Sequence, residues 1–240
     1  MAAMRALLLI VVMLALGACT SQPAPAATRI PAPTVPAVGE LLAGPRAGPV
    51  STVGYLYLTS DGAALVGGLS YATADPPEPL GAGLWLGELQ QLPAEPPLTQ
   101  AGDRRFGLAL AHGTLEGPGA YGPGGAYRYR LAAPVIESLG VRELSIPLLL
   151  ANTELYEGQP VRLEGQLLSG PDAALLVERL GSGGVPDDTA LQVKLAGPIA
   201  DQALTAGLRQ AGAPGVRFGP VAVTGLWRAG RLYPLAVVAR

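Results

Sequence analysis

The stretch Val161-Arg-Leu-Glu-Gly-Gln-Leu167 alternates apolar and polar side chains. A period of two is typical of a β-strand with one face buried and the other in water. The segment 50–58 (VSTVGYLYL) has Val, Gly and Leu at the same spacing and predicts a second strand. In that strand Tyr55 and Tyr57 fall on one face. Both stretches therefore favour β-structure.

These two strands belong to a longer repeat, displaced by 111 positions. After one inserted residue, RFG at 105–107 also matches RFG at 217–219, and Leu41-Leu42-Ala43 matches Leu149-Leu150-Ala151. Low complexity inflates matches of Gly, Ala and Leu, but it does not readily place Asp, Arg and Phe in the same order. Two copies of one domain are therefore predicted. The ungapped matches are Pro49, Val50, Gly54, Leu56, Asp61, Ala63, Leu65, Val66, Leu69, Leu80 and Leu84 with Pro160, Val161, Gly165, Leu167, Asp172, Ala174, Leu176, Val177, Leu180, Leu191 and Leu195.

Each copy is predicted to hold three strands, a helix or loop, and two more strands. Turn sequences at 60–62 (SDG) and 170–172 (GPD) follow the first strands. Residues 201–210 predict a helix capped by Asp201, while prolines between 93 and 97 predict a loop at the same place in the first copy. The other strands are expected over 63–69, 83–87, 108–115 and 127–132, and over 173–180, 191–195, 221–227 and 232–238.

This order of elements resembles the oligonucleotide/oligosaccharide-binding (OB) fold, a five-stranded Greek-key barrel with its helix between strands 3 and 4. The resemblance concerns topology only, and a small β-sandwich is the alternative. The fold class expected is all-β with one short helix: two tandem small barrels, over 46–139 and 140–240.

The N-terminus has the pattern of an export signal. The apolar run at 6–16 (ALLLIVVMLAL) spans about 16 Å as a helix, which is too short for a bilayer. Leu16-Gly17-Ala18-Cys19 then resembles the lipobox of bacterial lipoproteins. That resemblance implies removal of a signal peptide, 1–18, and attachment of lipid to Cys19. An ordinary signal peptide that leaves Cys19 free is the alternative.

A Pro/Ala-rich segment follows the cysteine. Residues 19–45 predict a disordered, extended tether between the membrane and the folded part. The protein is therefore expected to be extracytoplasmic and membrane-anchored, in the outer membrane or at the cell surface according to the type of envelope.

The composition excludes several kinds of site. One His and one Cys cannot build the usual zinc site or an internal disulfide. The net charge of −2 argues against nucleic acid as a partner. His112 is expected at the surface of a strand, and a catalytic triad would require a Ser or Thr and an Asp around it in a cleft. The protein is therefore predicted not to be an enzyme, with no metal and no cofactor.

Two loops carry weaker motifs. Residues 117–122 match G-x-G-x-x-G, but Pro118 and Pro123 exclude the helix that dinucleotide binding requires. We expect instead a long hairpin tip that presents Tyr121. Asp187 and Asp188 lie in a Gly-rich loop, yet two carboxylates are few ligands for Ca²⁺.

Aromatic side chains remain as the candidates for binding. Barrels of the resembled type bind their ligands partly by stacking on aromatic platforms. The alternative is that alternate members of the set lie in the core. We expect Tyr127 and Tyr129 to share a face, with Trp85 nearby. The candidate binding face is Tyr55, Tyr57, Tyr121, Tyr127 and Tyr129.

The function expected from the sequence is a non-enzymatic binding module on a lipid anchor, with an envelope protein or a glycan as partner. A structural spacer or assembly protein of the envelope is the alternative. The sequence does not decide the oligomeric state.

Overall fold

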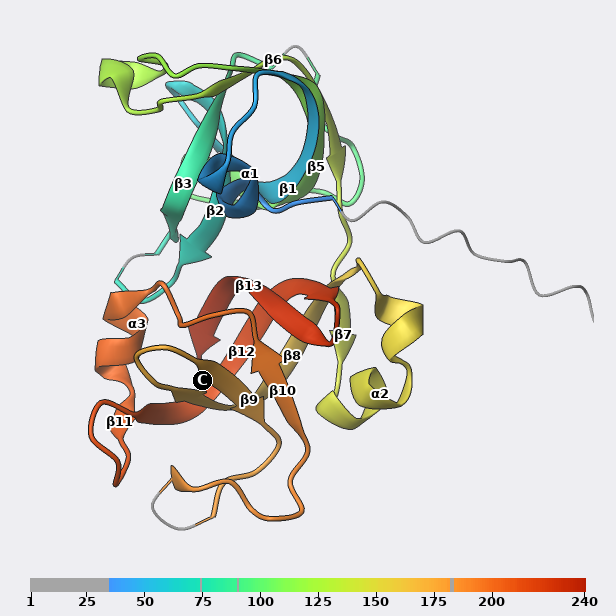
Figure 1. Ribbon diagram of the computed structural model, residues 1–240. Helices are drawn as coiled ribbons and strands as arrows, with labels where there is room; N and C mark the ends of the chain where they lie inside the picture. Colours follow the sequence, from blue (N-terminus) through green and yellow to red (C-terminus); the bar gives the residue numbers. More distant parts are fainter. Residues whose placement is uncertain (1–34, 74, 90, 182–183) are drawn as a thin grey trace, which may run out of the picture. The chain divides into compact units, whose positions relative to one another are not determined.

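The computed structural model of this protein describes residues 35–73, 75–89, 91–181 and 184–240 (Figure 1). Over these residues the protein is β-rich and has only short helices, as predicted, but it has three short α-helices rather than the one expected. None of the helices in these ranges is long and apolar enough to span a bilayer. The signal peptide, Cys19 and the tether up to residue 34 lie outside the described residues, and those predictions stay predictions.

The first half is a short helix followed by six strands. Between its last two strands lies a 3₁₀ turn, η1 (Pro123–Gly125). The bounds are α1 (Val38–Ala43), β1 (Gly48–Thr59), β2 (Gly62–Ser70), β3 (Glu78–Gly87), β4 (Thr99–Ala101), β5 (Arg104–Glu116) and β6 (Arg130–Ser138).

The second half repeats much of this order. Its bounds are β7 (Arg142–Leu144), α2 (Ile146–Ala151), η2 (Thr153–Tyr156), β8 (Pro160–Ser169), β9 (Ala174–Val177), β10 (Gln192–Leu195), α3 (Gln202–Gly207), β11 (Arg209–Gln210), β12 (Arg217–Arg228) and β13 (Arg231–Ala239). The helix α3 is the one predicted at 201–210, and the Asp201 side chain accepts a hydrogen bond from the Leu204 N–H at 3.0 Å. It ends earlier than predicted, at Gly207, because Arg209 and Gln210 pair with β12.

The strand pairings of each half run in a closed circuit. In the first half β1 pairs with β2 and β5, β2 with β3, and β5 with β6, all antiparallel; β3 and β6 then meet in parallel at Trp85 and Arg130. In the second half β8, β9, β10, β13 and β12 make the same circuit, again with one parallel contact, between β10 and β13. A parallel pairing of β2 with β13 joins both circuits in one mixed 13-stranded sheet.

A short helix packs against a glycine of the first long strand in each half. A Cβ on Gly54 would lie 2.8 Å from Cγ2 of Val38 in α1, and a Cβ on Gly165 would lie 3.2 Å from Cδ1 of Ile146 in α2. Both distances are shorter than an ordinary carbon–carbon contact. Glycine therefore lets each helix approach its strand closely, and Figure 1 shows α1 beside the curved strand β1.

A second pair of glycines sits at matched irregularities. The register of β5 against β6 shifts between His112 and Thr114, around Gly113. The register of β12 against β13 shifts at Gly225. A Cβ on Gly225 would lie only 2.3 Å from the Tyr233 carbonyl oxygen, so these bulges bring the backbones too close for a side chain.

The structure differs from the expected tether in residues 35–45. The helix α1 forms there, and Val38 is completely buried. It belongs to a cluster of buried side chains that we call the inner core of the first half, which includes Leu56, Leu65, Leu84 and Leu131. Leu41 and Leu42 pack against the same core. The folded part therefore begins before residue 46, because this short segment supplies apolar side chains that cover the end of the core.

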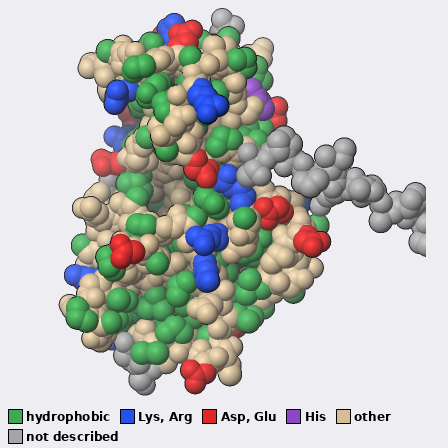
Figure 2. Space-filling model, viewed as in Figure 1, with side chains coloured by type: hydrophobic (Ala, Val, Ile, Leu, Met, Phe, Trp, Pro, Cys, Tyr) green, Lys and Arg blue, Asp and Glu red, His purple; other side chains and the backbone are tan. Residues whose placement is uncertain are grey.

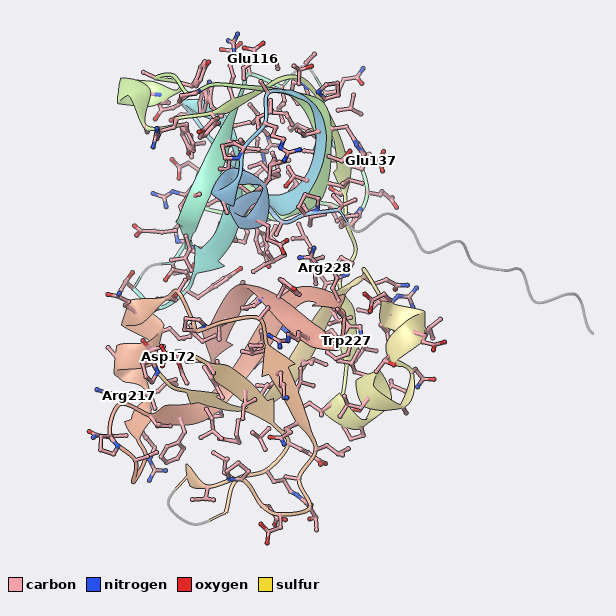
Figure 3. The ribbon with its side chains drawn as sticks, viewed as in Figure 1. Glu116, Glu137, Asp172, Arg217, Trp227 and Arg228 are labelled. Carbon is pink, nitrogen blue, oxygen red and sulfur yellow. The ribbon has the colours of Figure 1, made fainter. Side chains whose placement is uncertain are left out.

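The same segment also contacts the second half. Glu40 Oε2 accepts a hydrogen bond from the Ala37 N–H at 2.7 Å and pairs with Nη2 of Arg228 at 2.6 Å. Arg228, labelled in Figure 3, is only 6% exposed and lies 4.1 Å from the centroid of the Tyr233 ring. A cation over an aromatic ring and beside a carboxylate is held by both contacts.

Candidate binding site

Two half-buried aromatic side chains, Trp85 and Tyr127, pack together where the 117–129 hairpin reaches β3, and half-buried Tyr121 lies opposite Tyr127 in the hairpin. The Trp85 and Tyr127 rings lie 5.5 Å apart between centroids, with an interplanar angle of 32°. Tyr121 pairs with Tyr127 through two backbone hydrogen bonds of 2.9 and 3.0 Å. We call Trp85, Tyr121 and Tyr127 the aromatic patch.

The glycines of the G-x-G-x-x-G pattern serve the conformation of this hairpin. Gly122 has φ +71°, a conformation that favours glycine, and a Cβ there would lie 2.8 Å from the Tyr127 ring and 3.1 Å from the Trp85 ring. The G-x-G-x-x-G pattern is thus part of a tight loop packed on aromatic rings. Only the three-residue 3₁₀ turn η1 follows it and no α-helix, in agreement with the prediction from Pro118 and Pro123.

An ion pair borders the patch. Arg130 Nε lies 2.6 Å from Oε2 of Glu116, which is labelled in Figure 3 at the end of β5. The Arg130 guanidinium also lies 5.2 Å from the centroid of the Tyr121 ring. Both side chains are well exposed, so they offer hydrogen-bond donors and acceptors beside the aromatic faces. No sequence motif marks this pair, although both residues flank the hairpin.

Two of the predicted binding tyrosines are buried instead. Tyr55 is 7% exposed and Tyr57 is 4% exposed. The Tyr57 hydroxyl donates to the Pro77 carbonyl at 2.9 Å and accepts from Nη1 of Arg104 at 2.8 Å. Tyr57 therefore has the hydrogen bonds of a structural residue, and neither side chain belongs to an open platform.

Tyr129 does not share a face with Tyr127, so that expectation is wrong. Tyr129 packs against the inner core of the first half, while Tyr127 packs with the cluster that holds Tyr55 and Tyr57. The reason is that regular pairing in β6 begins only at Arg130, so the alternation of faces does not extend back to residue 127.

Burial changes the pKa of one tyrosine in the patch. The pKa of Tyr127 is raised, mainly because its hydroxyl is partly removed from water and secondly because the Tyr57 hydroxyl lies near. Tyr127 therefore stays neutral at physiological pH and is a hydrogen-bond donor there.

His112 forms part of a separate polar pair. Its Nδ1 lies 2.7 Å from Oγ of Ser51, its register partner on β1. The pair lines an open hollow of about 500 Å³, together with Thr114 and Val135. Among the described residues no carboxylate lines this hollow, so the arrangement lacks the third member of a triad.

The Asp187–Asp188 loop contains a local turn. Asp187 Oδ1 accepts hydrogen bonds from the N–H and the hydroxyl of Thr189, at 2.9 and 2.7 Å. These bonds lower the pKa of Asp187. No group of three or more potential metal ligands occurs within the described part of the chain.

The charged side chains are dispersed over the face shown in Figure 2 and form no block of one sign. No protein-family model, curated protein or solved structure matches this chain. The site is therefore interpreted from its own residues.

Proposed function

We propose that this protein is an extracytoplasmic lipoprotein, anchored through Cys19, that binds a glycan at the aromatic patch without catalysing a reaction. The observation that carries the proposal is the half-buried Trp85–Tyr127 pair, with Tyr121 and the Arg130–Glu116 ion pair beside it. Aromatic rings stack on the apolar faces of sugar rings, and charged planar groups bind their hydroxyls.

We propose further that each closed circuit of strands is a small five-stranded barrel of the OB type, and that the two barrels are copies of one domain. Support comes from the parallel contact between the third and fifth strands in both circuits. The glycines Gly54 and Gly165 against the short helices support the duplication, as do Gly113 and Gly225 at the bulges. In OB barrels the loop between strands four and five borders the ligand site, and the 117–129 hairpin occupies that position.

A glycan is favoured over nucleic acid by charge. The net charge is −2, and of the two arginines at the hairpin, Arg128 and Arg130, the one beside the Tyr121 ring is paired with a carboxylate. Phosphate binding needs unpaired basic groups along a track. Sugar binding needs aromatic faces and a few polar groups, which the patch supplies.

Affinity electrophoresis tests the proposed site. The full chain in detergent is run through gels that contain the soluble glycan fraction of the cell envelope. We expect retardation of the wild type and a clear loss of retardation in Tyr121→Ala and Tyr127→Ala. Phe218→Ala is the matched control, because Arg209 lies 5.2 Å from its ring in the other half. Equal retardation of all variants would place binding elsewhere, and retardation of none would remove the glycan.

Metabolic labelling with palmitate tests the anchor. Lipid on Cys19 predicts label in the wild-type chain and none in Cys19→Ala, and two or three acyl chains predict stable membrane association. An unlabelled wild-type chain would leave only the ordinary signal peptide.

A spacer or assembly protein is the second candidate. It is favoured by the contacts that join the halves: β2 with β13, and Glu40 with Arg228. Self-association in analytical ultracentrifugation at micromolar concentration would support this role, and a monomer would count against it.

A further inference from the structure

A polar cavity of about 290 Å³ lies apart from the aromatic patch. It is lined by strands of both halves and by the segment that connects them. Seven of its lining residues carry polar side chains: Tyr55, Tyr71, Thr99, Ser138, Glu143, Arg162 and Thr224.

Arg162 is the only cation among the described residues that line this cavity. It is half-buried in β8, yet it makes no ion pair or side-chain hydrogen bond with any described residue. Glu143 is its register partner on β7, but the two side chains do not form a salt bridge. A guanidinium has five N–H donors in a planar fork and binds carboxylates in bidentate fashion. The open donors of Arg162 therefore fit an anionic group.

The same position in the first half provides a comparison. Thr224 and Arg162 are register partners, as are His112 and Ser51. Ser51 and His112 satisfy each other through a bond of 2.7 Å. Arg162 and Thr224 do not bond to each other: Thr224 shares a side-chain hydrogen bond with Tyr55, and Arg162 has no described side-chain partner. The second half thus has at this position a cation without a described side-chain partner, where the first half has a closed Ser51–His112 pair.

Hydroxyl groups line the same cavity as Arg162. Tyr55 and Thr224 are buried, and Ser138 Oγ is buried without a hydrogen-bond partner among the described residues. Burial raises the pKa of Tyr71 and of Tyr55; the neighbouring Tyr71 adds to the rise at Tyr55, while the hydrogen bond with Thr224 and the charge of Arg162 oppose it. These phenols stay protonated and serve as donors.

The remaining wall is apolar. Phe106 and Leu108 of β5 line it, with Leu139 from the connecting segment. A site with one cation, several hydroxyls and an aromatic wall matches the chemistry of a sugar ring that carries a carboxylate. The volume is at the small end for ligand pockets, about 300 Å³, and suits one such residue.

We infer that this cavity binds a small polyhydroxylated carboxylate such as a uronic acid, with Arg162 on the carboxylate and the hydroxyls of Tyr55, Tyr71 and Thr224 on the ring oxygens. Glu143 at the rim accepts hydrogen bonds from ring hydroxyls. This inference does not rest on the aromatic patch or on the lipid anchor.

Isothermal titration calorimetry tests it on the full chain in detergent micelles, with sodium D-glucuronate as the probe and D-glucose as its neutral analogue. We expect saturable binding of glucuronate and at least tenfold weaker binding of glucose. Arg162→Gln should weaken glucuronate binding by at least tenfold. Arg142→Gln, on the exposed neighbouring strand β7, should leave it unchanged.

The inference is overturned if glucose binds as well as glucuronate, if Arg162→Gln binds like the wild type, or if neither sugar gives a saturable signal. Tyr55→Phe removes one hydroxyl from the cavity and keeps the ring, and we expect a several-fold loss. Circular dichroism of each variant establishes that it is folded. Tyr121→Ala should bind glucuronate normally, so the failure of one site is distinguishable from the failure of the other.

Discussion

Gly225→Ala should strongly destabilise the second half. The new Cβ would lie 2.3 Å from the carbonyl oxygen and 2.9 Å from the carbonyl carbon of Tyr233, and 3.1 Å from Cδ1 of Leu232. Carbon atoms pack best at about 3.5–4.0 Å, so the paired strand β13 has to move by about an ångström. Overpacking costs about 1–3 kcal/mol and occasionally more. We expect about 3 kcal/mol, because the obstacle is backbone rather than a flexible side chain.

Urea unfolding followed by tryptophan fluorescence measures this cost. Trp227 lies on the same strand as Gly225 and is 1% exposed, so its emission reports on this half. For a chain of this size about 3 kcal/mol corresponds to roughly 6–12 °C in Tm. Gly207→Ala is the control, since no atom lies within 4 Å of its added Cβ, and we expect no loss. A Gly225→Ala variant as stable as the wild type would refute the close approach at the bulge.

Three further predictions concern single contacts. Asp201→Ala should cost about 1 kcal/mol through loss of the cap on α3, while Asp201→Asn should cost little, and thermal unfolding of both variants checks this. Glu40→Gln should lower the free energy of unfolding in urea by about 1–2 kcal/mol, because it leaves buried Arg228 without a charged partner. The expected loss is smaller than for a fully buried ion pair, since the Glu40 side chain is 38% exposed. The pKa of Tyr55 in the folded chain is raised above its ordinary value of 10.0. Tyr55 therefore does not change the free energy of unfolding below pH 10, and it lowers that free energy above pH 10, where the unfolded chain ionises first. Tyr55→Phe should therefore flatten the fall in stability between about pH 10 and 12, and an unchanged slope would contradict this.

Local patterns predicted most of the strands, although the strand expected over 127–132 is β6, which runs over Arg130–Ser138. The alternation in Val161–Leu167 corresponds to β8, and the Asp201 cap begins α3 as expected. The helix α1 was missed because proline and alanine dominate its surroundings. The match of Leu41-Leu42-Ala43 with residues of α2 was the one signal that could have found it.

The candidate site was predicted less completely. Alternation placed Tyr55 and Tyr57 on one face of β1, but it does not reveal whether that face meets water. Here both faces of β1 are buried: Leu56 points into the inner core, and Tyr55 packs in a cluster that includes Leu226 of the second half. The cavity around Arg162 depends on the same packing of distant segments, for which the sequence gives no local signal.

The two tryptophans allow the most direct test of glycan binding at the aromatic patch. The ¹⁵N-labelled full chain in detergent has two indole N–H signals, from Trp85 in the patch and from buried Trp227, whose Nε1 donates to the Thr153 carbonyl at 3.2 Å. Titration with the soluble envelope glycans should shift the Trp85 signal in a saturable way and leave the Trp227 signal in place. A Trp85 signal that does not move at saturating glycan would contradict the proposed site.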